Sequence, residues 1–281
     1  MASDETIAED ELLDAARAGD AAAIEALVVR HQSRVFRFTQ RMCRDPHDAE
    51  DVLQETLLAM TRSIADFRGA SSISTWLYTI ARSYCIKKRR RSKFAPAHEV
   101  SLTSDEGRSA LDLPDGGRAP DEIVHGREIE SALSEAVGTL APPYREVLLL
   151  RDVEGLPAAE VAQVMGLTVE AVKSRLHRAR VSVREALAPM MGGLEIRRRG
   201  CPDMVRLFSK HLEGDVSPAV CARMEDHLSR CPYCERACES LKQTLRLCRA
   251  QPSPSVPEAV EKRLRREIEA LAANPRLQGR L

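Results

Sequence analysis

Four residues in the C-terminal part of the sequence have the types and spacing of metal ligands. Cys201 is followed after 25 residues by His227, after three more by Cys231, and after two more by Cys234. His227 and Cys231 are four residues apart and can share one face of a helix. Three thiolates and one imidazole complete a closed tetrahedral zinc site, which has no open position for water or substrate. The spacing therefore predicts a structural metal, and no nucleophile and base stand beside it to suggest an enzyme.

Three further cysteines lie near this set and allow two interpretations. Helical spacings of four, three, four and three residues place on one stripe Cys234, Cys238, Leu241, Leu245 and Cys248. Buried thiols pack as small apolar groups, so the stripe can simply be core. Alternatively, Cys221, Cys238 and Cys248 form a second, sensing site, because thiolates favour soft or borderline ions over Mg or Ca. Both interpretations stay open from the sequence.

Basic side chains are concentrated in two segments, although the chain has no net charge. It contains 42 Lys and Arg residues and 42 Asp and Glu residues. The run 82–93 has seven basic residues and no acidic one, and the run 171–184 has five basic residues and no acidic one. Residues 95–127, between them, have seven acidic and three basic residues. Two separate basic patches are the footprint expected of phosphate contacts.

The second basic run lies in a segment with a helix-turn-helix pattern. Residues 156–180 read LPAAEVAQVMGLTVEAVKSRLHRAR, and Thr168 follows the turn where it can cap the second helix. The inner positions of that helix are Val172, Leu176, Ala179 and Val183. The opposite face and its flanks, suited to base edges and phosphates, carry Glu170, Lys173, Ser174, Arg175, His177, Arg178 and Arg180. The alternative is a solvated charged face on an ordinary helical hairpin.

The elements that position these residues are predicted to be helices throughout, so the fold class is all-α. Asp45 before Pro46, for example, is a strong helix start. Composition predicts the following divisions: a helical domain at 1–94, a flexible acidic linker at 95–127, a helix-turn-helix domain at 128–190, a cysteine-rich domain at 200–250, and a Pro-rich spacer with a terminal helix at 251–281. Gly192 and Gly193 suggest a further hinge. Ser217-Pro218 is expected to open a helix.

The compartment is predicted from what the sequence lacks. No stretch reaches the 18 or so apolar residues of a membrane span, and the start MASDETIAEDELL is acidic where a signal peptide is basic. We therefore expect a cytoplasmic protein that needs no membrane. In that reducing compartment the eight cysteines are expected to be thiols or metal ligands.

Four ordered blocks of the sequence resemble the extracytoplasmic-function (ECF) sigma factors of bacterial RNA polymerase. AVKSRLHRAR resembles their reader of the promoter −35 element, and LAPPYREVLLLRDVEGL resembles its lead-in. DPHDAEDVLQETLLAM resembles the helix that grips the polymerase clamp, and FRGASSISTWLYTIARSYCIKKRRR resembles the segment that opens and holds the −10 element. The resemblance implies core RNA polymerase and promoter DNA as partners.

The resemblance also assigns roles to individual residues. The acidic side of the 45–60 helix would dock on polymerase through Asp48, Asp51, Gln54 and Glu55. Separated DNA strands need stacking surfaces and phosphate contacts, which the −10 segment would supply through Trp76, Arg82, Lys87, Lys88, Arg89 and Arg90. From the residues alone, the acidic face is equally typical of a solubilising surface, and Trp76 of core packing. Cys43 and Cys85 lie on apolar patterns and are expected in the core.

The C-terminal cysteine pattern resembles the zinc-binding domain of anti-sigma factors. A sigma factor ending in such a domain resembles the CorE-type factors, whose cysteine-rich tail responds to ions such as copper, cadmium or zinc. The resemblance implies a sigma factor regulated by its own tail, with structural zinc and a second metal ion as signal, and no separate anti-sigma factor required. The alternatives are a redox-responsive sigma factor and a stand-alone helix-turn-helix regulator.

Overall fold

The computed structural model describes residues 2–43, 45–94, 120–191, 200–251 and 254–272. These residues form helices and turns and no strand, which confirms the all-α prediction. The expected hinge at Gly192-Gly193 and most of the expected acidic linker lie outside the described residues. No helix in the described part of the chain is both long and apolar enough to cross a membrane.

The N-terminal domain (residues 2–94) is a bundle of four helices. They are α1 (Ala2–Arg17), α2 (Ala21–Met42), α3 (Pro46–Ser63) and α4 (Ile73–Phe94). Carboxylates start two of them: Asp20 accepts hydrogen bonds from the amides of Ala22 and Ala23, and Asp45 accepts from His47 and Asp48. The apolar stripes of α2 and α3 then meet in one core, which includes Leu27, Phe38, Val52, Leu53, Leu57 and Met60.

The helix-turn-helix domain (residues 120–191) follows. It contains α5 (Pro120–Thr139), α6 (Pro142–Leu148), a π-helical turn η2 (Leu149–Val153), α7 (Ala158–Met165) and α8 (Val169–Leu187). Gly166 has φ +64°, a conformation that favours glycine, and Thr168 accepts a hydrogen bond from the Ala171 amide. Helix α5 begins at Pro120, eight residues before the predicted start of this domain at Glu128.

The cysteine-rich domain (residues 200–251) has three helices and a small core of its own. These helices are α9 (Met204–Leu212), α10 (Pro218–Arg230) and α11 (Pro232–Arg249). Pro218 opens α10 as expected, but the side chain of Ser217 makes no capping hydrogen bond. The predicted cysteine stripe of α11 is buried over its whole length, from Cys234 to Cys248.

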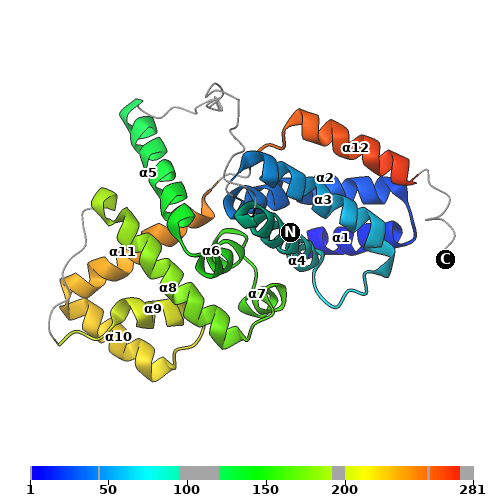
Figure 1. Cartoon of the computed structure of the whole chain (residues 1–281). Coiled ribbons are helices and arrows are strands. Elements are labelled where there is room, and N and C mark those ends of the chain that lie inside the picture. Colours follow the sequence, from blue (N-terminus) through cyan, green and yellow to red (C-terminus); the bar gives the residue numbers. More distant parts are fainter. Residues whose placement is uncertain (1, 44, 95–119, 192–199, 252–253, 273–281) are drawn as a thin grey trace.

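The chain then crosses back to the N-terminal domain. Figure 1 shows the last helix, α12 (Glu258–Ala272), lying along the helices of that domain and away from the cysteine-rich domain that precedes it. Helix α12 packs against α3 and α2, and its apolar side is buried through Val260, Leu264 and Ile268. The tail, which we define as residues 200–272, therefore reaches both other domains.

A buried carboxylate joins the N-terminal domain to the helix-turn-helix domain. Glu154 follows the turn η2, and its side chain is only 1% exposed. It accepts two hydrogen bonds from Arg37, at 2.8 and 2.7 Å, and one from the Tyr78 hydroxyl at 2.7 Å. Burial and this carboxylate raise the pKa of Tyr78, so its hydroxyl stays protonated and donates.

Replacing Glu154 by Gln should weaken this contact between the N-terminal domain and the helix-turn-helix domain, which we call the seam. The substitution keeps the shape but leaves Arg37 without its buried anionic partner, a loss that typically costs about 3–5 kcal/mol. We expect a lower melting temperature and a larger radius of gyration by small-angle scattering. The control is Glu170→Gln, at an exposed position of α8. Equal values for both variants and the unmodified protein would contradict the role of Glu154.

Candidate metal centre and nucleic-acid-binding surfaces

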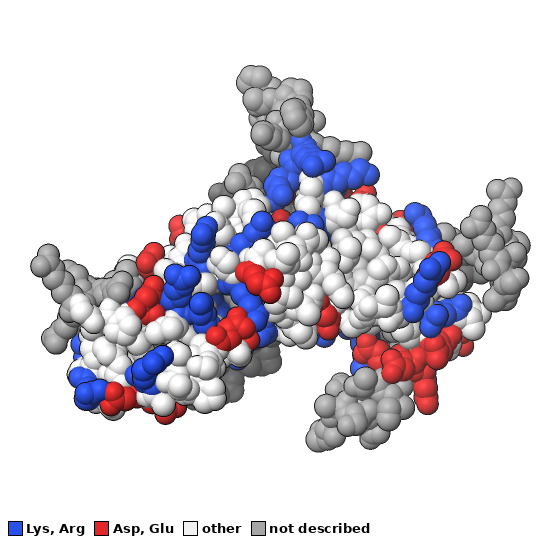
Figure 2. All heavy atoms as spheres, turned by 90° about the horizontal axis from the view of Figure 1, so that it is seen from below, with Lys and Arg blue, Asp and Glu red and all other residues white. Residues whose placement is uncertain are grey.

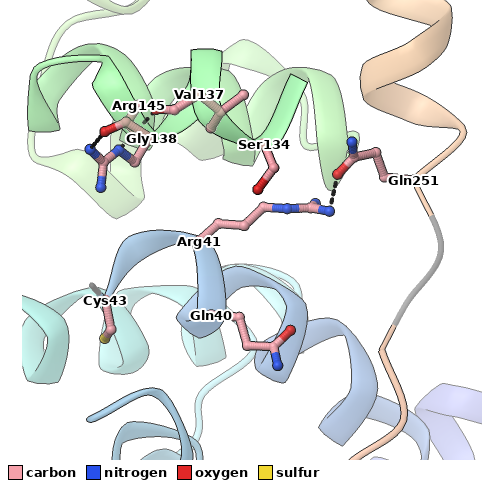
Figure 3. Close-up of a pocket in the computed structure, with 8 residues that line it drawn as sticks. All are labelled: Gln40, Arg41, Cys43, Ser134, Val137, Gly138, Arg145 and Gln251. Carbon is pink, nitrogen blue, oxygen red and sulfur yellow. Dashed lines mark hydrogen bonds between the residues drawn. The ribbon is translucent and has the colours of Figure 1, made fainter. Parts of the chain in front are cut away.

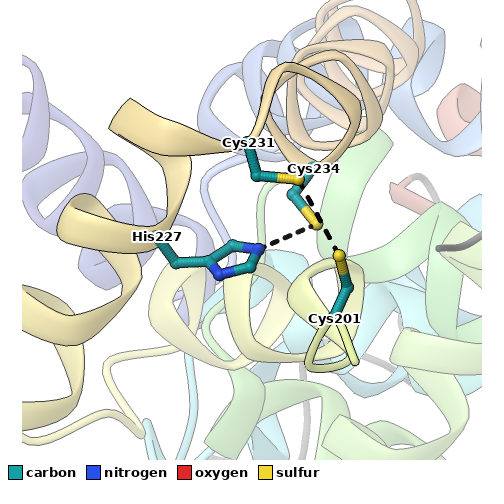
Figure 4. Close-up of side chains that lie close together, drawn as sticks. All are labelled: Cys201, His227, Cys231 and Cys234. Atoms are coloured by element: carbon teal, nitrogen blue, oxygen red, sulfur yellow. Dashed lines mark hydrogen bonds between the residues drawn. The ribbon is translucent and has the colours of Figure 1, made fainter. Parts of the chain in front are cut away.

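The four predicted metal ligands come together in the cysteine-rich domain. One ligand atom from each of Cys201, His227, Cys231 and Cys234 lies within 4.8 Å of all the others. Cys201 precedes α9, His227 lies near the end of α10, and the two remaining thiols lie at the start of α11. Figure 4 shows the four side chains pointing toward one another. His227 Nε2 lies 3.2 Å from Cys234 Sγ, and Cys201 Sγ lies 3.8 Å from Cys231 Sγ.

The electrostatics of this cluster suit a cation. Cys231 occupies the N-terminal cap position of α11, where backbone amides stabilise a thiolate and lower its pKa, the amide of Cys234 most of all. Burial and the neighbouring thiols raise the pKa of Cys234 to about 12. A bound divalent ion would offset both the burial and the crowding of negative charge. Three thiolates and one imidazole are compatible with zinc.

The other three cysteines of the tail do not meet. Cys221 is partly exposed beside His211, with 3.3 Å between Sγ and Nδ1. Cys238 is buried in the small core, and Cys248 in the core shared with the other domains. Burial raises the pKa of Cys238 to about 11 and of Cys248 to about 12, so both stay thiols. The structure therefore does not bring these three cysteines together, and Cys238 and Cys248 are packed in cores.

The DNA-reading face predicted on α8 is only partly free. Glu170, Ser174 and Arg178 are exposed, while Lys173, Arg175 and His177 are partly buried. The Lys173 ammonium donates to Asp215 of the tail, and Arg178 donates to the Tyr144 hydroxyl at 3.2 Å. Burial lowers the pKa of His177. The predicted inner face of α8 is confirmed, because its four apolar residues are fully buried.

The structure places Arg180 inside the protein, and not beside the charged face of α8 where the sequence predicted it. Its side chain is 1% exposed and donates to both oxygens of Asp152, at 2.8 and 2.6 Å. It also donates to Glu213 of the tail at 2.8 Å, and Arg151 donates to the same carboxylate at 3.0 Å. Helical spacing alone placed Arg180 at the edge of the charged face, but these two carboxylates draw it inward. In this structure it cannot contact DNA.

The residues expected at the −10 element lie along α4, partly engaged with other groups. Trp76 is half-buried against Phe67, with ring centroids 4.9 Å apart. Arg82 donates to Glu146 of α6 at 2.8 Å, and the Arg89 guanidinium lies 3.8 Å from the same carboxylate. Lys87 and Arg90 are exposed. Figure 2 shows the Lys and Arg side chains of the described residues in separate groups on the face that is drawn.

The acidic face of α3 is covered in part by two other helices. Lys88 of α4 donates to Asp51 at 2.8 Å and lies 3.1 Å from Asp48. From α12, Arg263 lies 3.8 Å from Asp51, while Glu267 accepts a hydrogen bond from Gln54 at 2.6 Å. Glu55 is exposed. The predicted docking residues thus share one face, and α12 occupies part of it.

Sequence reasoning missed the carboxylates that hold the domains together. Glu146, Asp152 and Glu154 are each at most 5% exposed and pair with arginines distant in the chain. A detectable sign was present, because EVLLLRDVEG places acids within a strongly apolar run. Such acids are almost never buried without a partner.

Comparisons with known proteins agree with this arrangement. The models for Sigma-70 region 2 and Sigma-70 region 4 match residues 27–94 and 130–183, and a zinc-finger family model matches residues 201–234. The RNA polymerase sigma-H factor of Pseudomonas aeruginosa is 30% identical over 188 residues, covering 65% of this chain and 95% of the relative. The ECF RNA polymerase sigma-E factor of Haemophilus influenzae is 30% identical over 196 residues, covering 66% and 99%. The ECF RNA polymerase sigma factor SigE of Mycolicibacterium smegmatis is 32% identical over 174 residues, covering 60% and 65%.

The fold and the matched regions define a helical, DNA-binding transcription initiation factor, and not an enzyme. The chain belongs to the family of ECF sigma factors of RNA polymerase, with a zinc-finger domain in its tail.

Replacing Cys231 by Ser should remove the metal and unfold the cysteine-rich domain together. A structural zinc ion supplies much of the folding free energy of so small a domain. We expect about one zinc ion per chain in the unmodified protein and markedly less in the variant, measured by elemental analysis, with loss of helical circular dichroism. The control is Cys221→Ser, which should keep the metal. Equal zinc content in both variants would show that the four-residue cluster is not the site.

Proposed function

We propose that the tail regulates this ECF sigma factor from within the same chain by covering two of its working surfaces. The observation that carries the proposal is the division of the tail: α9 and α11 lie on α8, whereas α12 lies on α3. Under this proposal the tail does the work of an anti-sigma factor, so no separate one is required.

The first surface is the proposed −35 reader on α8. Once the tail has left, Glu170, Ser174, His177 and Arg178 would face the major groove, with Lys173 and Arg175 on the phosphates. In this structure the tail is seated on α8, and we call this arrangement the closed form. Lys173 pairs with Asp215, and the backbone and hydroxyl oxygens of Ser209 lie within 3.4 Å of Arg180. An acidic group of the tail, Asp215, thus occupies Lys173, a basic group that would otherwise be available to a phosphate.

The second surface is the proposed polymerase-docking face of α3, with Asp48, Asp51, Gln54 and Glu55. Helix α12 contacts two of these residues through Arg263 and Glu267, and it buries Leu264 against the N-terminal domain. Because α12 and polymerase would use the same helix, their binding would be mutually exclusive. Helix α12 would have to leave α3 before core polymerase could dock.

The proposed −10 surface is constrained by the seam between the domains. Trp76, Arg82, Lys87, Lys88, Arg89 and Arg90 would hold separated strands along α4. Helix α7 packs against α4, and Glu160 of α7 accepts a hydrogen bond from the Ser72 hydroxyl at 2.8 Å. Arg82 is engaged by Glu146. Promoter binding would therefore require the two sigma domains to move apart.

The metal centre is proposed as the point of control. Zinc bound by Cys201, His227, Cys231 and Cys234 would keep the cysteine-rich domain folded and seated on α8. Since the other tail cysteines do not converge, a response to copper, cadmium or zinc would act through this four-residue site. A redox signal is the second candidate, because oxidation of the same thiols would also release the tail. A metal panel and a peroxide series, compared on the intact protein, distinguish the two.

Ending the chain after residue 191 should raise promoter-dependent transcription by core RNA polymerase. Removal of the tail frees α8 and α3 together, and typical coupling between two such states is about 1–3 kcal/mol, or roughly 5–150-fold. The measurement is the protein concentration that gives half-maximal transcript in vitro. Leu264→Asp, which unseats α12 alone, should give an intermediate increase.

The control for Leu264→Asp is Arg266→Asp, which adds the same acid on the exposed side of α12. It should behave like the unmodified protein. If the shortened chain and Leu264→Asp both require as much protein as the unmodified chain, the tail does not inhibit the sigma domains.

Reversing Glu55 to Lys in the shortened chain should weaken association with core polymerase. Glu55 is exposed on α3, so packing is preserved while the charge at the proposed docking face is reversed. Charges at the edge of a protein–protein interface mainly change the association rate and its salt dependence. We expect a slower association rate in surface plasmon resonance. Glu25→Lys, a reversal on α2, is the control, and equal rates for both variants would place the docking face elsewhere.

A further inference from the structure

Two cysteines of the N-terminal domain face each other across the bundle. Cys43 directly follows α2, and Cys85 lies in the middle of α4. Their sulfur atoms are 3.4 Å apart. Cys43 is partly exposed, whereas Cys85 is 4% exposed. The pair therefore combines one accessible thiol with one protected partner, and neither belongs to the metal centre.

The chemistry of the two thiols differs. The hydrogen bond with Cys85 lowers the pKa of Cys43, and the positive charges of Lys88 and Arg89 act in the same direction. The same hydrogen bond and burial raise the pKa of Cys85. Cys43 is thus the better nucleophile of the two, and Cys85 remains the thiol that donates toward it.

The surroundings of the pair link it to the contact between the domains. On α4, Arg82 and Arg89 lie three residues before and four residues after Cys85, so all three share one side of the helix. Both arginines approach Glu146 of the helix-turn-helix domain. Cys43 lies at the edge of a cavity of about 270 Å³ between α2, α5 and α6, and its side chain points away from this cavity into its own domain (Figure 3).

We propose that Cys43 and Cys85 are an oxidisable thiol pair, which a hydroperoxide converts to an intramolecular disulfide that disturbs the seam at Glu146. The inference does not depend on the inhibitory role of the tail.

The reaction balances without any group beyond the peroxide. The Cys43 thiolate attacks one peroxide oxygen, the O–O bond breaks, and hydroxide leaves with formation of a sulfenic acid. This hydroxide takes up the proton that the Cys43 thiol released and becomes water. The sulfur of Cys85 then attacks the sulfur of Cys43, the S–O bond breaks, and the released hydroxide takes the Cys85 proton as water. Two thiols are oxidised by two electrons, and hydrogen peroxide is reduced to two water molecules.

Bond formation requires the two sulfur atoms to move together. A disulfide bond is about 2.05 Å long, so the sulfurs must approach by more than an ångström from their 3.4 Å separation. Because Cys85 lies on the same side of α4 as Arg82 and Arg89, a shift of α4 toward Cys43 would alter the contacts of both arginines with Glu146. A thiol pair inside one domain can in this way change the contact between two domains.

The test treats the full zinc-loaded chain with hydrogen peroxide, alkylates the remaining thiols and maps peptides by mass spectrometry. We expect a peptide pair joined through Cys43 and Cys85, two hydrogens lighter than the reduced pair, at a dose that leaves the zinc bound. Cys231→Ser, which disrupts the metal centre, should still form it. Full alkylation of Cys43 and Cys85 at doses that oxidise the metal centre would overturn the proposal.

A second measurement follows the distance between the sigma domains, by energy transfer between dyes placed on α2 and α8. Oxidation should change it in the unmodified chain but not in Cys43→Ala or Cys85→Ala. If these variants fold poorly, the unmodified chain before and after reduction of the disulfide gives the same comparison. A disulfide that forms without any change in distance would overturn its coupling to the seam.

Discussion

Two buried carboxylates on one turn, Asp152 and Glu154, hold the three parts of the chain in place. Glu154 reaches Arg37 of the N-terminal domain, while Asp152 binds Arg180, which in turn binds Glu213 of the tail. A buried charge must be paired, so separating any two of these parts exposes or strands a charge. The same charged groups are well solvated once they are exposed to water, so the closed form can open reversibly. Apolar surfaces of equal area would not be well solvated after separation.

The local shape of the backbone makes this double contact achievable. The chain from Leu149 to Val153 is a π-helical turn, a wider winding that is frequent at functional sites. Asp152 and Glu154 are two residues apart, a spacing that places side chains on different sides of a helix. One turn can therefore point a carboxylate toward each neighbouring part. The apolar residues around it, Leu148 to Leu150, fill the core and fix the turn.

The sequence predicted what depends on neighbours within one helix or one short motif. The capping of α3 and α8, the apolar face of α8 and the ligand spacing of Cys231 and Cys234 all follow from local geometry. It did not predict contacts between segments far apart, because spacing along the chain carries no information about them. Arg180 shows this best, since nothing near it in sequence indicates Asp152 and Glu213 as partners. The position of α12 on α3 was likewise open, because the sequence predicted only that a terminal helix exists.

Charge complementarity explains how one surface can serve two states under the proposed mechanism. Helix α8 is basic, and the tail presents to it the carboxylates Glu213 and Asp215, each against an arginine or a lysine. DNA would present phosphates to the same helix, also as anions bound by charge-assisted hydrogen bonds. At Lys173, therefore, the tail and DNA would satisfy the same donor and could not do so together. A helix whose basic side chains can bind phosphate can for the same reason bind an acidic segment of its own chain. The zinc-finger domain holds that segment beside α8.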